Sequence, residues 1–134
     1  MTYYDLNSEL SNINRHASTK DCVISEDLRR VLTQALRLSK DTSGIYDVSR
    51  IVSALTKRAL LPDHGYKLSE GASWKDISLV GNRLRFKNDL AIDLAGIAKG
   101  YAVDSAFETV KDCCLSEGVS LSINAGGDTR SSDW

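Results

Sequence analysis

The chain has 134 residues, of which 42% are hydrophobic and 26% are charged, the composition of one ordinary globular domain. Its 17 basic and 18 acidic residues give a formal net charge of −1 with no basic stripe, so nothing in the charge pattern indicates nucleic-acid binding. No apolar run approaches the roughly 18 residues of a membrane-spanning helix, and the first residues lack a signal-peptide pattern. The three cysteines match no metal-binding spacing.

Hydrophobic periodicity predicts helices in the first half of the chain. Residues 1–20 are polar, and we expect a helix end followed by a loop there. Ser25 is a predicted N-cap, and a helical stripe continues to about position 40, with Gly44 as its stop. A second helix is expected from position 48 or 49 up to Pro62, because proline cannot continue a helix.

Short strands are predicted in the second half. Residues 77–86 alternate apolar and polar side chains around a Gly-Asn turn, which predicts a β-hairpin. Residues 90–93 form a third predicted strand, and a helix follows that begins near Gly96 and ends at Gly118. Residues 119–124 form a fourth predicted strand. Helices followed by short strands indicate the α+β class, with helices packed on a small, mostly antiparallel sheet.

The segment AIDLAGIAKGYAVDSA, residues 91–106, carries the strongest signal for chemistry. Asp93 ends the predicted strand, and the first amides of the next helix have no intrahelical partner, which makes that helix end a natural anion site. Lys99 in the first turn opposes the helix dipole, which suggests a negative partner. The alternative, favoured on pattern alone, is that Asp93 only caps the helix and Lys99 lies in solvent. The run is neither a P-loop nor a Rossmann fingerprint.

Two further segments carry weaker signals. In SGIYDVS, residues 43–49, Tyr46 could stack on a flat ring and Asp47 could accept a hydrogen bond from it. The alternative is a helix boundary, with Asp47 as the N-cap and Tyr46 in the core. In INAGGDT, residues 123–129, Asp128 could hold a metal or a ribose hydroxyl, and the alternative is a tight turn. Each segment alone favours its structural alternative.

Taken together and in this order, these segments resemble the ApbE-type flavin transferases, that is, FAD:protein FMN transferases. Residues 91–106 closely resemble the family signature Leu-Asp-Leu-Gly-Gly-Ile-Ala-Lys-Gly-Tyr-Ala-Val-Asp, and residues 43–49 look like its Gly-Gly-Ala-Phe-Asp segment. TYYDLNSELSNIN, residues 2–14, is similar to an early block of the family, and residues 123–130 are similar to its Gly-Gly-Asp strand. The resemblance implies an ApbE or T-fold-like fold of the α+β class.

The resemblance also implies an enzyme, cofactors and partners. Members bind FAD with Mg²⁺ and transfer FMN to a threonine or serine hydroxyl of a target flavoprotein, and some members hydrolyse FAD instead. The residues that it implies for contact with the flavin nucleotide are Tyr4, Ile45, Tyr46, Asp47, Asp93 and Lys99. It implies that Gly96 offers its backbone carbonyl to Mg²⁺, and it assigns no catalytic side chain here. With the family in view, we expect residues 93–99 to form a site.

The sequence departs from the family pattern at two positions of residues 43–49 and in its length. Ser43 and Ile45 stand where the family usually has glycine and alanine. Because the family runs to roughly twice this size, we expect residues 1–134 to be one ApbE-like domain truncated at both ends, or a degenerate short relative. We expect no FMN transfer by these residues alone, because the family's downstream magnesium-binding aspartate and threonine lie outside the sequence. The alternatives are a non-catalytic flavin- or nucleotide-binding module, an FAD pyrophosphatase-like relative and a purely structural domain.

The sequence leaves the compartment open. Members of the resembled family are mostly exported and membrane-anchored in bacteria, with some cytoplasmic members, whereas this sequence shows no export signal.

Overall fold

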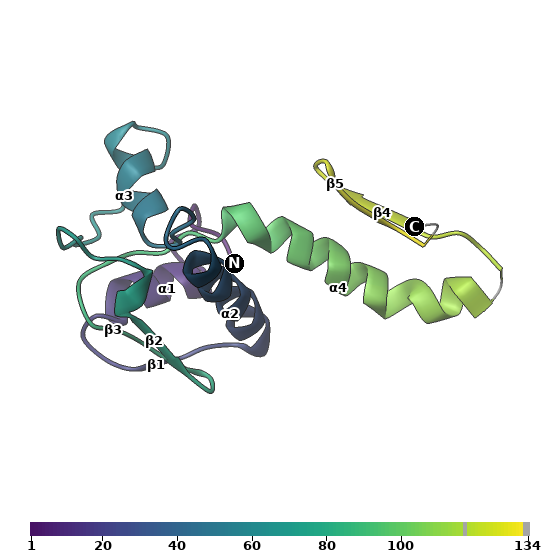
Figure 1. Ribbon diagram of the computed structural model, residues 1–134, viewed down its shortest axis with the longest axis horizontal. Coiled ribbons are helices and arrows are strands. Elements are labelled where there is room, and N and C mark those ends of the chain that lie inside the picture. Colours follow the sequence, from purple (N-terminus) through teal and green to yellow (C-terminus); the bar gives the residue numbers. More distant parts are fainter. Residues whose placement is uncertain (117, 133–134) are drawn as a thin grey trace. The chain divides into compact units, whose positions relative to one another are not determined.

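The computed structural model describes residues 1–116 and 118–132. The chain divides into two compact units, Met1–Ala95 and Gly96–Trp134, which are described separately (Figure 1). The described residues form helices and short antiparallel strands, so the predicted α+β class is confirmed. No helix in this described part of the chain has the length and hydrophobicity that crossing a bilayer requires.

The first unit contains three helices and a three-stranded sheet (Figure 1). The helices are α1 (Glu9–His16), α2 (Glu26–Asp41) and α3 (Arg50–Lys57), and a 3-10 turn covers Trp74–Asp76. The antiparallel sheet has the order β1 (Cys22–Val23), β3 (Arg83–Phe86) and β2 (Ile77–Val80). The predicted hairpin at residues 77–86 is therefore confirmed, with Leu79 opposite Leu84.

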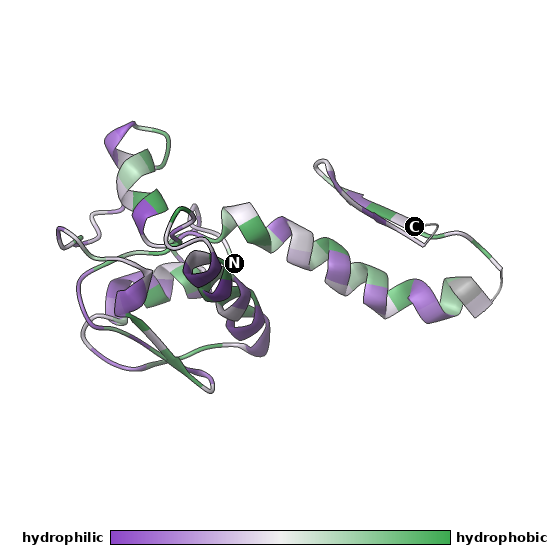
Figure 2. Cartoon of the chain, in the orientation of Figure 1, coloured by the Kyte–Doolittle hydropathy of each residue, from purple (hydrophilic) through white to green (hydrophobic). Residues whose placement is uncertain are grey.

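Helix α2 begins at the predicted N-cap. The Ser25 hydroxyl accepts a hydrogen bond from the backbone N–H of Leu28 at 3.3 Å, and Glu9 of α1 accepts bonds from both the backbone N–H and the hydroxyl of Ser25. In Figure 2 much of α2 has the purple of hydrophilic residues. The opposite face of α2 packs into the core of the first unit. Large, fully buried side chains of this unit include Leu10, Ile13, Leu28, Leu32, Leu84, Phe86, Ile92 and Leu94.

The end of α2 places a serine in a left-handed conformation. The backbone N–H of Gly44 donates to the carbonyl of Ser39 at 2.7 Å, which closes the helix and confirms the predicted stop. Gly44 has φ +82°, and a Cβ atom there would lie 3.3 Å from the indole nitrogen of Trp74, so this position requires glycine. Ser43 has φ +53°, a conformation that is unfavourable for a residue with a Cβ atom.

We expect Ser43→Gly to raise the free energy of unfolding by about 0.5–1 kcal/mol, because the relief of the left-handed strain exceeds the added entropy of the unfolded chain. Urea denaturation measures the change. Lys40→Gly is the opposite control, because glycine within helix α2 should cost about 1 kcal/mol. A loss of stability in Ser43→Gly would contradict the argument.

Three sequence predictions for the first unit were wrong. Residues 90–93 are extended and buried but form no strand, because the backbone of Ile92 bonds to the side chain of Asn14 instead of to a neighbouring strand. The N-terminal segment holds a full helix, α1, which Ser8 caps by accepting from Ser11 N–H at 3.1 Å. Helix α3 ends at Lys57 rather than at the proline, since Ala59 already has φ +55°.

The second unit consists of α4 (Ala95–Ser116, its first residue assigned to the first unit) and a hairpin of β4 (Ser122–Ala125) and β5 (Asp128–Ser131). The two glycines between Ala125 and Asp128 have φ +61° and +104°, as a two-residue hairpin turn requires. The tight turn expected before Asp128 is thus present.

Arg130 holds the hairpin against α4. Its guanidinium donates to Asp104 at 3.1 Å and to Glu108 at 2.7 Å, and it lies 4.4 Å from the centre of the Phe107 ring. Both charge pairing and cation–π attraction therefore join the two elements of this unit.

Candidate functional site

Backbone hydrogen bonds bring two of the predicted motifs together in the first unit. The N–H of Asp93 donates to the carbonyl of Val48 at 3.2 Å, so residues 46–49 lie beside residues 92–94. Asn14 of α1 holds the same segment from another element: its Nδ2 donates to the carbonyl of Ile92 at 3.0 Å, and its Oδ1 accepts from the Ile92 N–H at 2.9 Å. These bonds replace those of a β-ladder and fix the position of Asp93.

Asp93 is a buried carboxylate, with 5% of its surface exposed. Its Oδ1 accepts a hydrogen bond from Ala95 N–H at 3.3 Å, so the predicted capping contact exists. Burial nevertheless raises the pKa of Asp93, and the backbone N–H groups of Ala95 and Leu94 offset that effect only in part. A buried carboxylate with a raised pKa is typical of a functional site. A carboxylate that only caps a helix at the surface stays in contact with water and has no such burial.

Tyr46 lies close to Asp93 and Asp47. Burial raises the pKa of the Tyr46 phenol, and the negative charges of Asp93 and Asp47 raise it further. The phenol therefore stays protonated and can donate a hydrogen bond. The structure thus gathers three of the predicted flavin-contacting residues in one region of the first unit.

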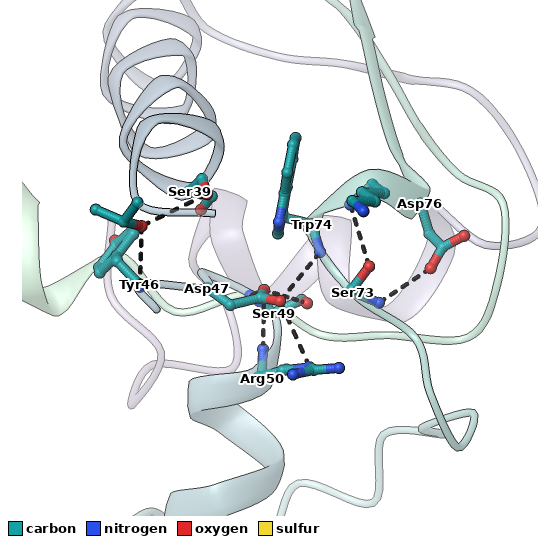
Figure 3. A network of polar contacts seen from close by, with 10 residues as sticks. Ser39, Tyr46, Asp47, Ser49, Arg50, Ser73, Trp74 and Asp76 are labelled. Carbon is teal, nitrogen blue, oxygen red and sulfur yellow. Dashed lines mark hydrogen bonds and ion pairs between the residues drawn. The ribbon is translucent and has the colours of Figure 1, made fainter. Parts of the chain in front are cut away.

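Asp47 is the centre of a polar network at the start of α3 (Figure 3). Its Oδ1 accepts from Ser49 N–H at 2.9 Å, from the Ser49 hydroxyl at 2.7 Å and from Arg50 N–H at 3.3 Å. Its Oδ2 accepts from Trp74 N–H at 3.4 Å and lies 3.7 Å from Nε of Arg50. Asp47 therefore lies at the helix boundary, as the structural alternative expected, but the N-cap of α3 is Ser49 and not Asp47. Asp47 accepts from the amides of Ser49 and Arg50, two and three residues further on. Contact between its side chain and FAD stays a prediction.

Tyr4 and Ile45 extend into solvent, with 63% and 93% of their surfaces exposed. The neighbouring Tyr3 is buried, and its ring lies 4.9 Å from the ring of His64 and 5.8 Å from that of Tyr66. Tyr3 therefore packs the core, while Tyr4 and Ile45 present large apolar surfaces that a ligand could cover.

Gly96 and Lys99 belong to the second unit and are both exposed. Because α4 begins at Ala95, Lys99 is its fifth residue and lies just beyond the first turn, not within it as predicted. Gly96 lies in the first turn, where amides lack intrahelical acceptors.

The described residues do not form a magnesium centre by themselves. Among them, no group of three or more His, Cys, Asp or Glu side chains could hold a metal ion. The predicted ligand, the carbonyl of Gly96, is a single oxygen, whereas Mg²⁺ takes six ligands and is usually bound by carboxylates, phosphates and water.

Sequence reasoning missed Asn14 as a site-building residue. It lies four residues after Leu10 on the buried side of α1, and the residue is 5% exposed. A polar residue at an apolar position of the helical repeat was the available signal, because a buried amide requires hydrogen-bond partners.

Comparison with known proteins supports the same family. The model of the ApbE family matches residues 1–133. The chain is 29% identical over 145 residues to an FAD:protein FMN transferase of Haemophilus influenzae, covering 97% of this chain and 41% of that protein. A second FAD:protein FMN transferase, of Vibrio cholerae, is 29% identical over 143 residues, with the same coverage. The chain thus spans about 41% of the length of these curated relatives.

Solved structures show the same fold. The apo form of the Pseudomonas stutzeri flavinyl transferase ApbE superposes with a TM-score of 0.80 at 21% identity, covering 98% of this chain and 44% of that chain. The flavin transferase ApbE of Vibrio cholerae gives a TM-score of 0.74 at 27% identity, covering 98% and 45%. The resemblance inferred from the sequence motifs is therefore confirmed.

Proposed function

Because this chain belongs to the ApbE family, we propose that it binds FAD and takes part in the transfer of FMN from FAD to a threonine or serine hydroxyl of a target flavoprotein. The names of its relatives, FAD:protein FMN transferases, support the reaction class. The observation that carries the proposal is the buried carboxylate of Asp93 beside Tyr46 and Asp47.

Each predicted residue has a role in this proposal. Asp93 accepts a hydrogen bond from a hydroxyl of the nucleotide, a task for which a buried carboxylate is well suited. Tyr46, together with the exposed side chains of Tyr4 and Ile45, provides surface for a flat ring. Lys99 and the first amides of α4 attract the diphosphate. Asp47 positions the Tyr46 segment through its hydrogen bonds to the start of α3.

The proposal includes a requirement for Mg²⁺, with Gly96 as one ligand. The remaining ligands would be FAD phosphates and water, as is usual for Mg²⁺ bound with nucleotides. We assign no step of the reaction to the ion. Titration of FAD in the presence and absence of MgCl₂ tests the requirement, and equal affinity in both titrations would remove Mg²⁺ from the proposal.

We expect Asp93→Asn to weaken FAD binding by at least tenfold, about 1.4 kcal/mol, while the fold is kept. Asparagine has the same shape and can still accept the bond from Ala95 N–H, so a residue that only caps the helix would tolerate the change. Calorimetric titration with FAD measures the affinity. Asp112→Asn on the exposed surface of α4 is the matched control. Unchanged affinity in Asp93→Asn would refute the proposed role.

The pH dependence of stability provides a second readout for Asp93. Its folded-state pKa is raised above the ordinary value of 3.8, so between the two values the folded state binds more protons than the unfolded state. The contribution of Asp93 to the unfolding free energy is therefore fully present below pH 3.8 and is lost as the pH rises through the folded-state pKa. Asp93→Asn should remove this decline and be at least as stable as the wild type at neutral pH. Denaturation at several pH values tests this prediction.

A further inference from the structure

The first unit has a pocket on the surface of α3. A cavity of about 790 Å³ lies between α3, the segment 68–72 and residues 89–90. None of the predicted flavin-contacting residues lines it, although its lining includes Ser49 and Arg50, which bond to Asp47. Its volume lies within the usual range for pockets that hold small molecules.

Three cations line this pocket. Arg50 and Lys57 lie seven residues apart on α3, which places them about two turns from each other on one face, and Arg58 follows as the C-cap. Two carboxylates, Glu70 and Asp89, also belong to the lining. The formal charge of the ionisable lining residues is therefore +1, from three positive and two negative groups.

The cations are available for a ligand. Among the described residues, Arg58 is the one arginine whose guanidinium forms no ion pair and no hydrogen bond with the protein. The ammonium group of Lys57 also has no ion-pair or hydrogen-bond partner among these residues. Arg50 approaches Asp47 only at 3.7 Å, through Nε. Arginine binds phosphate oxygens through its planar fork, and lysine binds them as a point charge.

The remaining lining adds a hydroxyl group and apolar surface to the three cations. The hydroxyl group of Ser53 adds a donor beside the cations, and Ala54, Leu68 and Leu90 form an apolar wall. Together they offer charge for an anionic group and apolar surface for the organic part attached to it. We propose that this α3 pocket binds the phosphate group of a small phosphorylated molecule.

A titration followed by ¹H–¹⁵N NMR tests the proposal without flavin, so it does not depend on the proposed function. Inorganic phosphate is added to the 1–134 chain at low ionic strength, where surface charges are least screened. We expect saturable shifts of amides in residues 49–58 and 68–72. The absence of saturable shifts there would overturn the proposal.

The double variant Lys57→Gln/Arg58→Gln should weaken phosphate binding at least tenfold. The control Lys67→Gln/Lys87→Gln removes the same charge from exposed positions outside the pocket and should change affinity by less than twofold. An equal loss in both variants would show attraction to the overall charge and refute a specific site.

A parallel titration with adenosine monophosphate identifies the source of the phosphate. Tighter binding than inorganic phosphate shows that the apolar wall holds an organic part, and equal binding shows recognition of the phosphate alone.

Discussion

Replacing Asp47 by alanine is expected to lower the free energy of unfolding by about 3–5 kcal/mol. The Asp47 carboxylate is buried and accepts hydrogen bonds from the backbone N–H groups of Ser49, Arg50 and Trp74. Its removal leaves the buried N–H of Ser49 and the partly buried N–H groups of Arg50 and Trp74 without this acceptor. An unsatisfied donor costs about 1–3 kcal/mol where it is buried. The measurement is urea denaturation followed by circular dichroism, which reports on the helices.

Two further variants separate the causes of this loss. Asp47→Asn keeps an oxygen that can accept at the Oδ1 position but removes the charge opposite Arg50, so we expect a smaller loss of about 1–2 kcal/mol. Asp41→Ala removes an exposed carboxylate whose pair with Arg37 is 3.5 Å long, and its effect should stay within about 0.5 kcal/mol. If Asp47→Ala were as mild as Asp41→Ala, the network of Figure 3 would not stabilise the fold.

The elements with strong local signals were predictable from the sequence. Helix α2 has an apolar repeat, a serine N-cap and a glycine at its end, and all three signals agree with the structure. The hairpin of β2 and β3 likewise combines alternation with a Gly-Asn turn. In both cases the residues that determine the element lie within it, so local rules are sufficient.

The segment at residues 90–93 shows where local rules fail. Its apolar residues are buried as in a strand, but the hydrogen-bond partner of Ile92 is a side chain far away in the sequence. Alternation and burial do not reveal the partner of a backbone group, so the sequence could not distinguish a strand from a pinned extended segment. The same reason explains why the site was predicted only in part. The two motifs contain Tyr46 and Asp93. The hydrogen bond that joins the motifs, from Asp93 N–H to the carbonyl of Val48, forms only in the folded chain.

Replacing Asn14 tests how far the segment at residues 90–93 depends on its hydrogen bonds to this side chain. We expect Asn14→Leu to lower the free energy of unfolding by about 3–5 kcal/mol. The substitution removes both hydrogen bonds to Ile92 and leaves a buried N–H and a buried carbonyl without partners, each at a cost of about 1–3 kcal/mol. Thermal and urea denaturation measure the loss. Asn12→Leu, an exposed substitution on the same helix, is the matched control and should change stability by no more than about 0.5 kcal/mol.

Asn14 also provides a test of how Asp93 is held in place. The amide bonds the residue immediately before Asp93, so its loss frees the segment that carries the buried carboxylate. Where Asn14→Leu remains folded, at low temperature, FAD affinity should fall together with protection of the Ile92 amide from hydrogen exchange. If that amide exchanged faster while FAD affinity stayed at the wild-type value, the bond would serve stability alone. The candidate flavin site would then not depend on the position of residues 92–93.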